Sequence, residues 1–186
     1  MLEVITAQLR EKAITIKTGT LVEATIIASA SKDDDEGRWV KHKGKPAIRG
    51  FKAHIGADAG TALVEKIAVT PANVNDGRAG DAVIPDDPGE GFVSRYPLLH
   101  GGPGQGWHAT RGRDGLVGSR RTGLQAWNQP IHHSRGRIEK IFGTWKRSCG
   151  LRRMRWRGLA KATAQVHFTA IACNPKPTLN ILATAA

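Results

Sequence analysis

Residues 135–147 read RGRIEKIFGTWKR and carry the clearest structural pattern in the chain. Their apolar side chains recur at i, i+3, i+4 and i+7, the spacing that places four side chains on one face of a helix. These apolar residues are Ile138, Ile141, Phe142 and Trp145. The stretch predicts a helix that packs against a core, with Glu139 at the edge of the buried face.

Glu139 is the single acid of this basic stretch, and two interpretations of it are open. One is an exposed helical acid paired with Arg135 at i−4, an interaction worth only about 0.3 kcal/mol. The other is a carboxylate that reaches into a site where a polyanion is handled, because Arg135 precedes it by one turn and Lys146 and Arg147 follow it.

A second helix is predicted from about Gly158 to Cys173, after Gly150 stops the first. Between the two helices, LRRMRWR at residues 151–157 interleaves guanidinium groups with Trp156. This composition suits contacts to phosphates, with stacking on a base or sugar. The alternative is a solvated face between two helices.

Strands are predicted in the N-terminal half, where residues 19–70 contain three apolar segments separated by turn residues. They are expected to be antiparallel. In the second segment alternate residues share one face, namely Phe51, Ala53 and Ile55. His54 is on the other face and is expected to meet solvent rather than to act as a ligand or base. The acidic run at residues 33–36 could attract a cation, but a solvated loop is the favoured interpretation.

The order of elements favours an α/β fold of the mixed α+β kind, because a short helix ending near Lys12 is followed by strands and then by helices. Between Gly91 and Gly123, nine of the chain's 22 glycines occur without a sustained period of 2 or 3.6. No regular strand is predicted there. A stretch of this length without elements indicates a basic insertion or a damaged segment.

Charge favours an anionic partner, nucleic acid above all, since the formal net charge is +12 and the pI about 10.3. Half of the 28 basic residues lie between Arg111 and Lys161. Cys149 and Cys173 show no spacing for a disulfide framework or a zinc site, so reduced core thiols are expected. No signal peptide or membrane segment is apparent, which predicts a cytoplasmic protein without a membrane partner.

Two longer segments carry a family resemblance. The first begins GTLVEATIIASA at Gly19 and includes GFKAHIGADAGTALVEKIAVTPANVND from Gly50, and the second begins AWNQPIHHSRGRIEKIFGTW at Ala126. Over about residues 19–90 and 124–182, the chain resembles the DDE transposases of bacterial insertion sequences, in the group four/five superfamily. The resemblance implies a ribonuclease-H-like core in which three carboxylates hold two Mg²⁺ ions for cutting and joining DNA strands.

The resemblance also implies partners. These are double-stranded DNA, the terminal inverted repeats of an insertion element and a second copy of the chain in a homo-oligomer, at the bacterial nucleoid. The expected DNA contacts are Arg135, Arg137, Lys146, Arg147, Arg152, Arg153, Arg155, Trp156 and Arg157.

Carried over by position, Glu23 stands where the family has its first Asp, and Glu139 stands at the third carboxylate. Both are therefore the expected catalytic metal ligands. Glu at position 23 keeps the charge but moves its oxygens one methylene further out, and a displacement of about 1 Å can cost on the order of a hundredfold in rate. The second carboxylate is missing, because no acid occurs from Gly91 to Arg113 and nothing indicates a strand that would hold Asp114.

The expected domains follow from the same match. Residues 1–18 are a remnant of the family's N-terminal helical region, and residues 19–182 are the catalytic-type domain, with residues 91–123 disordered or translated out of frame. The expected function is a transposase whose cutting and joining is impaired in this copy. The alternative is a catalytically dead DNA-binding remnant that competes with an intact transposase or joins its assemblies. A third hypothesis is a decayed reading frame whose product barely folds.

Overall fold

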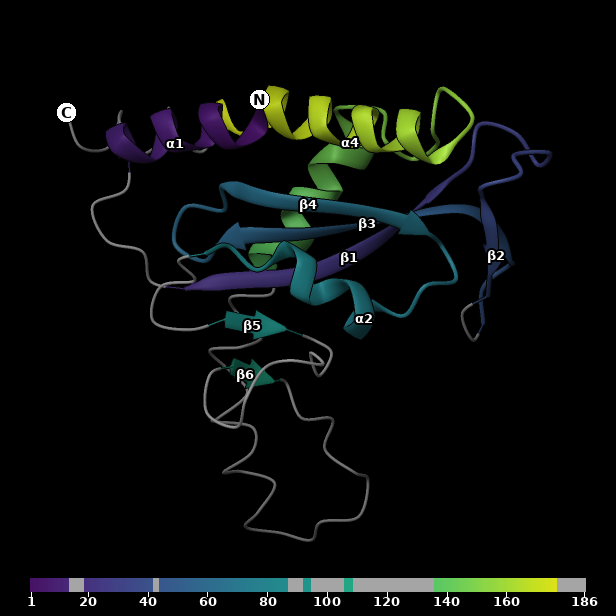
Figure 1. Ribbon diagram of the computed structural model, residues 1–186, viewed down its shortest axis with the longest axis horizontal. Helices are drawn as coiled ribbons and strands as arrows, with labels where there is room; N and C mark the ends of the chain where they lie inside the picture. Colours follow the sequence, from purple (N-terminus) through teal and green to yellow (C-terminus); the bar gives the residue numbers. More distant parts are fainter. Residues whose placement is uncertain (14–18, 42–43, 87–91, 95–105, 109–135, 177–186) are drawn as a thin grey trace, which may run out of the picture.

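The computed structural model describes residues 1–13, 19–41, 44–86, 92–94, 106–108 and 136–176. A sheet forms the centre of the molecule, and helices lie around it (Figure 1). In chain order, the elements are α1 (Leu2–Ala13), β1 (Thr20–Ala28), β2 (Arg38–Val40), β3 (Ile48–Asp58), β4 (Val64–Pro71), α2 (Asp76–Gly80), the 3₁₀ turn η1 (Asp81–Val83), β5 (Phe92–Ser94), β6 (Gly106–His108), a helix over residues 136–147, and α4 (Leu159–Cys173).

The sheet has the strand order β2-β3-β1-β5-β6, and β4 also pairs with β3. β1 and β3 are antiparallel from Thr20↔Asp58 to Ala28↔Gly50. The other edge of β3 is shared, because β2 pairs with its first residues and β4 with the remainder. β5 runs parallel to β1, and β6 runs parallel to β5.

One face of the sheet is apolar because alternate residues of β1 and β3 project from it together. Phe51 and Ile55 are fully buried there, in one hydrophobic core with Ile138, Phe142 and Trp145 of the helix over residues 136–147. The rings of Phe142 and Trp145 meet edge to face, with their centroids 5.9 Å apart. This helix therefore packs on the sheet through the stripe that its sequence predicts.

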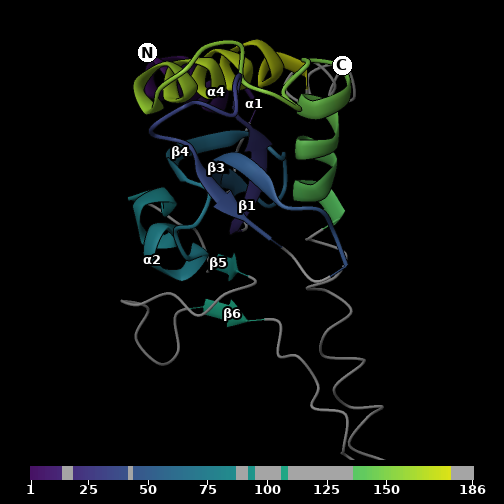
Figure 2. The same cartoon turned by 90° about the vertical axis from the view of Figure 1, so that its right-hand side faces the viewer.

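The opposite face is covered by α2 and η1. Lys52 of β3 forms an ion pair of 2.7 Å with Asp76 of α2 and donates a hydrogen bond to the carbonyl of Val74. Figure 2 shows the helix over residues 136–147 and α2 on opposite sides of the sheet, while α1 and α4 run along the β4 edge. Among the described residues, no helix has the length and apolar character needed to cross a membrane.

The structure confirms the mixed α/β fold, the antiparallel β1, β3 and β4, and the three helices that the sequence predicts. It adds β2, which is only three residues long. It also places β5 and β6 within residues 91–123, where no regular strand was predicted. The other residues of that segment lie outside the described part of the chain.

Candidate active site and nucleic-acid interface

Glu23 projects from β1 toward the face of the sheet that the helix over residues 136–147 covers. Its register partner on β3 is Ile55, a residue of the hydrophobic core. The side chain is 7% exposed, and one of its carboxylate oxygens accepts a hydrogen bond of 3.3 Å from the backbone N–H of Ala24. The backbone of Glu23 is fixed by its pairing with β3, and its carboxylate is buried on the core side of the sheet.

Glu139 lies on the helix that covers that face. The preceding residue, Ile138, is 1% exposed and belongs to the core, while Glu139 itself is exposed. The fold thus brings together the two elements that carry the predicted first and third carboxylates. Arg135, which the sequence offers as the ion-pair partner of Glu139, lies outside the described residues.

β5, the parallel neighbour of β1, does not supply the second carboxylate. β5 pairs with β1 from Thr20↔Phe92 to Val22↔Ser94, and none of its three residues is acidic. Within the described ranges, no three His, Cys, Asp or Glu side chains gather closely enough to hold a metal ion. Glu23 and Glu139 have the hard oxygen donors that Mg²⁺ prefers, but they do not complete a three-carboxylate set.

The basic segment at residues 151–157 is attached to the end of β1. The backbone N–H of Ala28 donates to the carbonyl of Arg152 at 3.2 Å, and the backbone N–H of Met154 donates to the carbonyl of Ala28 at 2.7 Å. Leu151 and Met154 are buried, which fixes the segment to the core. Its exposed residues are Arg152, Arg153, Arg155, Trp156 and Arg157. All five were predicted as DNA contacts, and all five lie on the surface.

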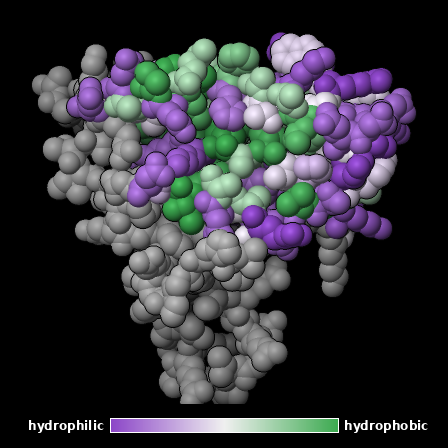
Figure 3. Space-filling view, in the orientation of Figure 1, coloured by the Kyte–Doolittle hydropathy of each residue, from purple (hydrophilic) through white to green (hydrophobic). Residues whose placement is uncertain are grey.

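Hydrophilic side chains gather around this end of the molecule in the space-filling view, where β2 and the start of α4 lie (Figure 3). Trp156 is half exposed there. A row of guanidinium groups with one exposed indole can contact phosphates and stack on a base or sugar.

The acidic run at residues 33–36 is exposed at three of its four members, but its interpretation as a solvated loop is wrong for Asp34. Asp34 is 2% exposed, and its carboxylate accepts hydrogen bonds from Ser29 Oγ and, at 3.3 Å, from the backbone N–H of Gly158. Glu36 Oε2 accepts from the backbone N–H of Leu159 at 2.7 Å. These carboxylates satisfy N–H groups at the start of α4, which no residue of the helix itself can do.

The pKa of Asp34 reflects two opposed effects. Burial alone would raise it, but the hydrogen bonds from Ser29, Gly158 and Glu36 outweigh burial and hold the pKa below its usual value. Asp34 is therefore a charged structural group that ties the loop after β1 to the segment carrying the basic residues.

The remaining predicted DNA contacts differ in how they are placed. Arg137 donates through Nη1 to the carbonyls of Ala59 and, at 2.9 Å, Gly60, so its guanidinium is bound to the β3–β4 turn. Lys146 is half-buried, and burial, followed by the charges of Lys45 and Arg152, lowers its pKa. Arg147 is exposed.

His54 does not face solvent, contrary to the expectation from strand alternation. It is 1% exposed, and its Nε2 lies 2.9 Å from Thr70 Oγ1. Burial lowers its pKa to about 4; the charge of Asp76 acts in the opposite direction, and that of Lys52 adds to the lowering. The residues of β3 on the same face as His54 pack against α2. His54 therefore belongs to a buried polar cluster on the side of the sheet away from Glu23.

Comparison with known families adds one match. The sequence model described as "Transposase DDE domain" matches residues 15–86 and 108–174, which include both Glu23 and Glu139. No solved structure matches the chain.

Proposed function

The chain belongs to the family of transposase DDE domains, and from this premise we propose that it binds double-stranded DNA through residues 151–157 but is impaired in strand cutting and joining. The observation that carries the proposal is the attachment of this basic segment to Ala28, at the end of the strand that holds Glu23. A segment already fixed by two backbone hydrogen bonds loses little freedom on binding DNA.

The exposed guanidinium groups set the expected strength and salt dependence of binding. Each phosphate that is neutralised releases counterions and contributes about −0.9 to the slope of log K against log salt. Four such contacts from Arg152, Arg153, Arg155 and Arg157 would give a slope of roughly −3 to −4. Trp156 adds a stacking surface that is insensitive to base identity.

Binding is tested by fluorescence anisotropy with a labelled duplex at several salt concentrations. Arg153→Gln and Arg155→Gln should each weaken binding and reduce the salt slope by about one. The matched control is Arg78→Gln, which removes one exposed charge from α2 on the other side of the sheet. Equal effects of all three substitutions would show that DNA binding does not depend specifically on residues 151–157.

The proposed impairment rests on the carboxylates. In the family, three carboxylates hold two Mg²⁺ ions that neutralise the phosphodiester and stabilise its leaving oxygen. We propose Glu23 and Glu139 as the two that remain here, and no catalytic step is assigned because β5 contributes no third.

Cleavage is tested on a duplex that bears the ends of the element, with Mg²⁺ or Mn²⁺ and with Glu139→Gln as the control. Binding without cleavage supports an impaired transposase and agrees with the alternative of a DNA-binding remnant. Metal-dependent cleavage that Glu139→Gln abolishes would contradict the impairment, because another acid, such as Asp114, would then complete the site. Addition of the protein to an intact transposase, with inhibition or co-assembly as the readout, tests the remnant alternative directly.

We propose that residues 19–182 are the catalytic-type domain, that residues 91–123 are read out of frame relative to working bacterial insertion-sequence transposases, and that the cognate DNA is a pair of terminal inverted repeats recognised by a homo-oligomer. Gene sequencing tests the frame: a compensating pair of small indels around residues 91 and 123 is expected, and its absence would make the segment a true insertion.

A further inference from the structure

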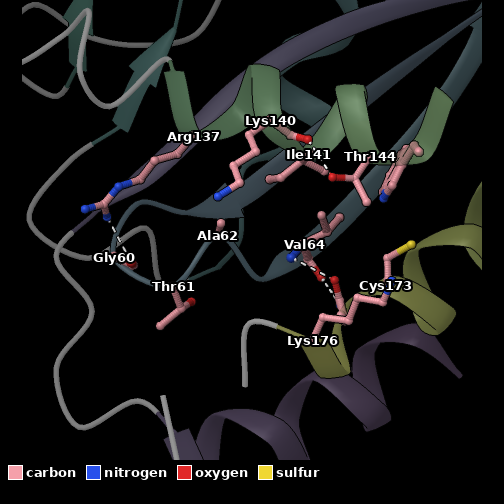
Figure 4. A pocket seen from close by; sticks show the side chains of 12 residues that line it. Gly60, Thr61, Ala62, Val64, Arg137, Lys140, Ile141, Thr144, Cys173 and Lys176 are labelled. Carbon is pink, nitrogen blue, oxygen red and sulfur yellow. Dashed lines mark hydrogen bonds between the residues drawn. The ribbon is translucent and has the colours of Figure 1, made fainter. Parts of the chain in front are cut away.

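A pocket of about 400 Å³ lies between the helix over residues 136–147, the turn after β3 and the end of α4 (Figure 4). Its floor is apolar, formed in part by Val64, Ile141 and Trp145. Arg137, Lys140 and Lys176 bring three positive charges to it, and none of the described residues that line it is acidic. A concave site with charges of one sign above an apolar floor concentrates its electrostatic field and favours an anionic ligand.

One of the three charged groups is fixed by hydrogen bonds, and the other two lie at the pocket without such a partner among the described residues. The guanidinium of Arg137 is fixed at the mouth by the carbonyls of Ala59 and Gly60. The amino group of Lys140 lies between its helix and the turn that contains Ala62 (Figure 4). Among the described residues, neither Lys140 nor Lys176 has an ion-pair partner.

The pocket is separate from the proposed carboxylate site. Arg137, Lys140, Ile141 and Thr144 follow the spacing i, i+3, i+4 and i+7 and so share one flank of their helix. Glu139 is two residues from Arg137, or about 200° around the helix, which places it on the other flank.

The pocket is also separate from the basic segment at residues 151–157. That segment pairs with Ala28, at one end of β1. The pocket is lined by Gly60 and Thr61, which follow the β3 residue that pairs with Thr20 at the other end of β1. Thr20 and Ala28 are the two ends of β1, about 27 Å apart at about 3.4 Å per residue. One phosphate cannot reach both places.

We propose that this pocket is a second phosphate-binding site, in which Lys140 and Lys176 hold a phosphate group and Arg137 holds the mouth in shape. The chemistry recognised is a phosphate monoester or diester. The phosphate belongs either to a DNA backbone or to a free nucleotide. The first of these sources rests on the proposed function. The anion site itself depends on neither strand cleavage nor the basic segment.

The site is tested by titrating the full chain with inorganic pyrophosphate in a calorimeter at constant ionic strength. The wild type should bind one equivalent saturably, and the double substitution Lys140→Gln, Lys176→Gln should weaken binding at least tenfold. Both lysines are exposed, and a thermal melt shows whether the variant is folded. Arg78→Gln is the control and should bind as the wild type does. Absence of saturable binding to the wild type, or equal binding by the double variant, would overturn the proposal.

The source of the phosphate is separated with a labelled duplex and a 5′-mononucleotide. If DNA occupies the pocket, the double variant should lose several-fold in duplex affinity, and unlabelled duplex should displace pyrophosphate from the wild type. If the double variant loses pyrophosphate and mononucleotide but binds duplex normally, a free nucleotide is the ligand. Arg153→Gln should weaken duplex binding and leave pyrophosphate binding unchanged, so failure of the DNA proposal is distinguishable from failure of this one.

Discussion

The thiol groups of Cys149 and Cys173 lie 2.8 Å apart, although 24 residues separate them in the chain. Cys149 follows the helix over residues 136–147, and Cys173 is the last residue of α4. Both are free and half-buried. Neither residue type nor spacing predicted this contact, because it depends on how the two helices end beside each other.

Oxidation should convert this pair to a disulfide. Treatment with diamide, which takes up the two hydrogens, should reduce the protein mass by about 2 Da and stabilise the fold by about 3 kcal/mol, the size expected for closing a loop of this length. Burial, followed by the hydrogen bond to Cys149, raises the pKa of Cys173 to about 12, so this thiol should resist alkylation at neutral pH. Mass spectrometry and a thermal melt with and without dithiothreitol check this. An unchanged mass would contradict this prediction. So would an oxidised Cys149→Ser variant that melts at the same temperature as the oxidised wild type.

The cap that residues 33–36 provide to α4 should be measurable in the unfolding free energy. Glu36→Ala removes the acceptor for the backbone N–H of Leu159 and should cost about 1 kcal/mol, while Glu36→Gln, which keeps an oxygen acceptor, should cost less. Urea unfolding provides the measurement. Asp35→Ala is the matched control, an exposed acid of the same run, and it should leave the stability unchanged. A larger loss for Asp35→Ala than for Glu36→Ala would argue against the cap.

Burial of His54 should make the protein less stable in mild acid. The folded state keeps the imidazole neutral down to about pH 4, whereas the unfolded chain takes up the proton near pH 6.5. The contribution is therefore complete above pH 6.5 and is lost as pH falls from about 6.5 to about 4, with a slope of at most about 1.4 kcal/mol per pH unit. Unfolding free energies measured across this range should show a smaller slope in His54→Gln.

Thr70→Val tests whether titration or the hydrogen bond causes that slope. It removes the partner of His54 Nε2 but keeps the buried imidazole, so it should lower stability at all pH values and leave the slope in place. An unchanged slope in His54→Gln would show that another group titrates in this range.

The sequence predicted those parts of the fold that repeat locally. The stripe of Ile138, Phe142 and Trp145 gave a helix and its buried face, and this stripe now packs on the sheet of a ribonuclease-H-like domain. Alternation along β3 correctly grouped the residues of each face. It could not show that α2 and η1 cover the face of His54, because burial of that face depends on a later segment.

The parts that sequence reasoning missed are short or distant. β5 and β6 have three residues each, too few to show a period, and they are strands only because each has a neighbour to pair with. The contact between Glu36 and Leu159 spans 123 residues, so no local pattern could separate a helix cap from a solvated acid. For the candidate site, the positions of Glu23 and Glu139 came from the family resemblance, and the carboxylates alone would not have distinguished them from ordinary acids.

β3 and η1 lie so close together at Gly56 that only glycine fits there. A Cβ atom added to Gly56 would lie 1.9 Å from the carbonyl oxygen of Val83, a backbone atom that cannot rotate away. Gly56→Ala should therefore push η1 off the sheet and cost about 1–3 kcal/mol or more, the range for overpacking a core.

Gly143→Ala is the matched control, since its Cβ would lie 3.2 Å from Nη2 of Arg147, the far end of a flexible side chain. Because Gly143 is inside the helix over residues 136–147, alanine there should stabilise the protein by up to about 1 kcal/mol. Urea unfolding of the two variants and the wild type gives both values. Opposite signs are expected for the two substitutions, and a neutral Gly56→Ala would mean that η1 does not pack on β3 as described.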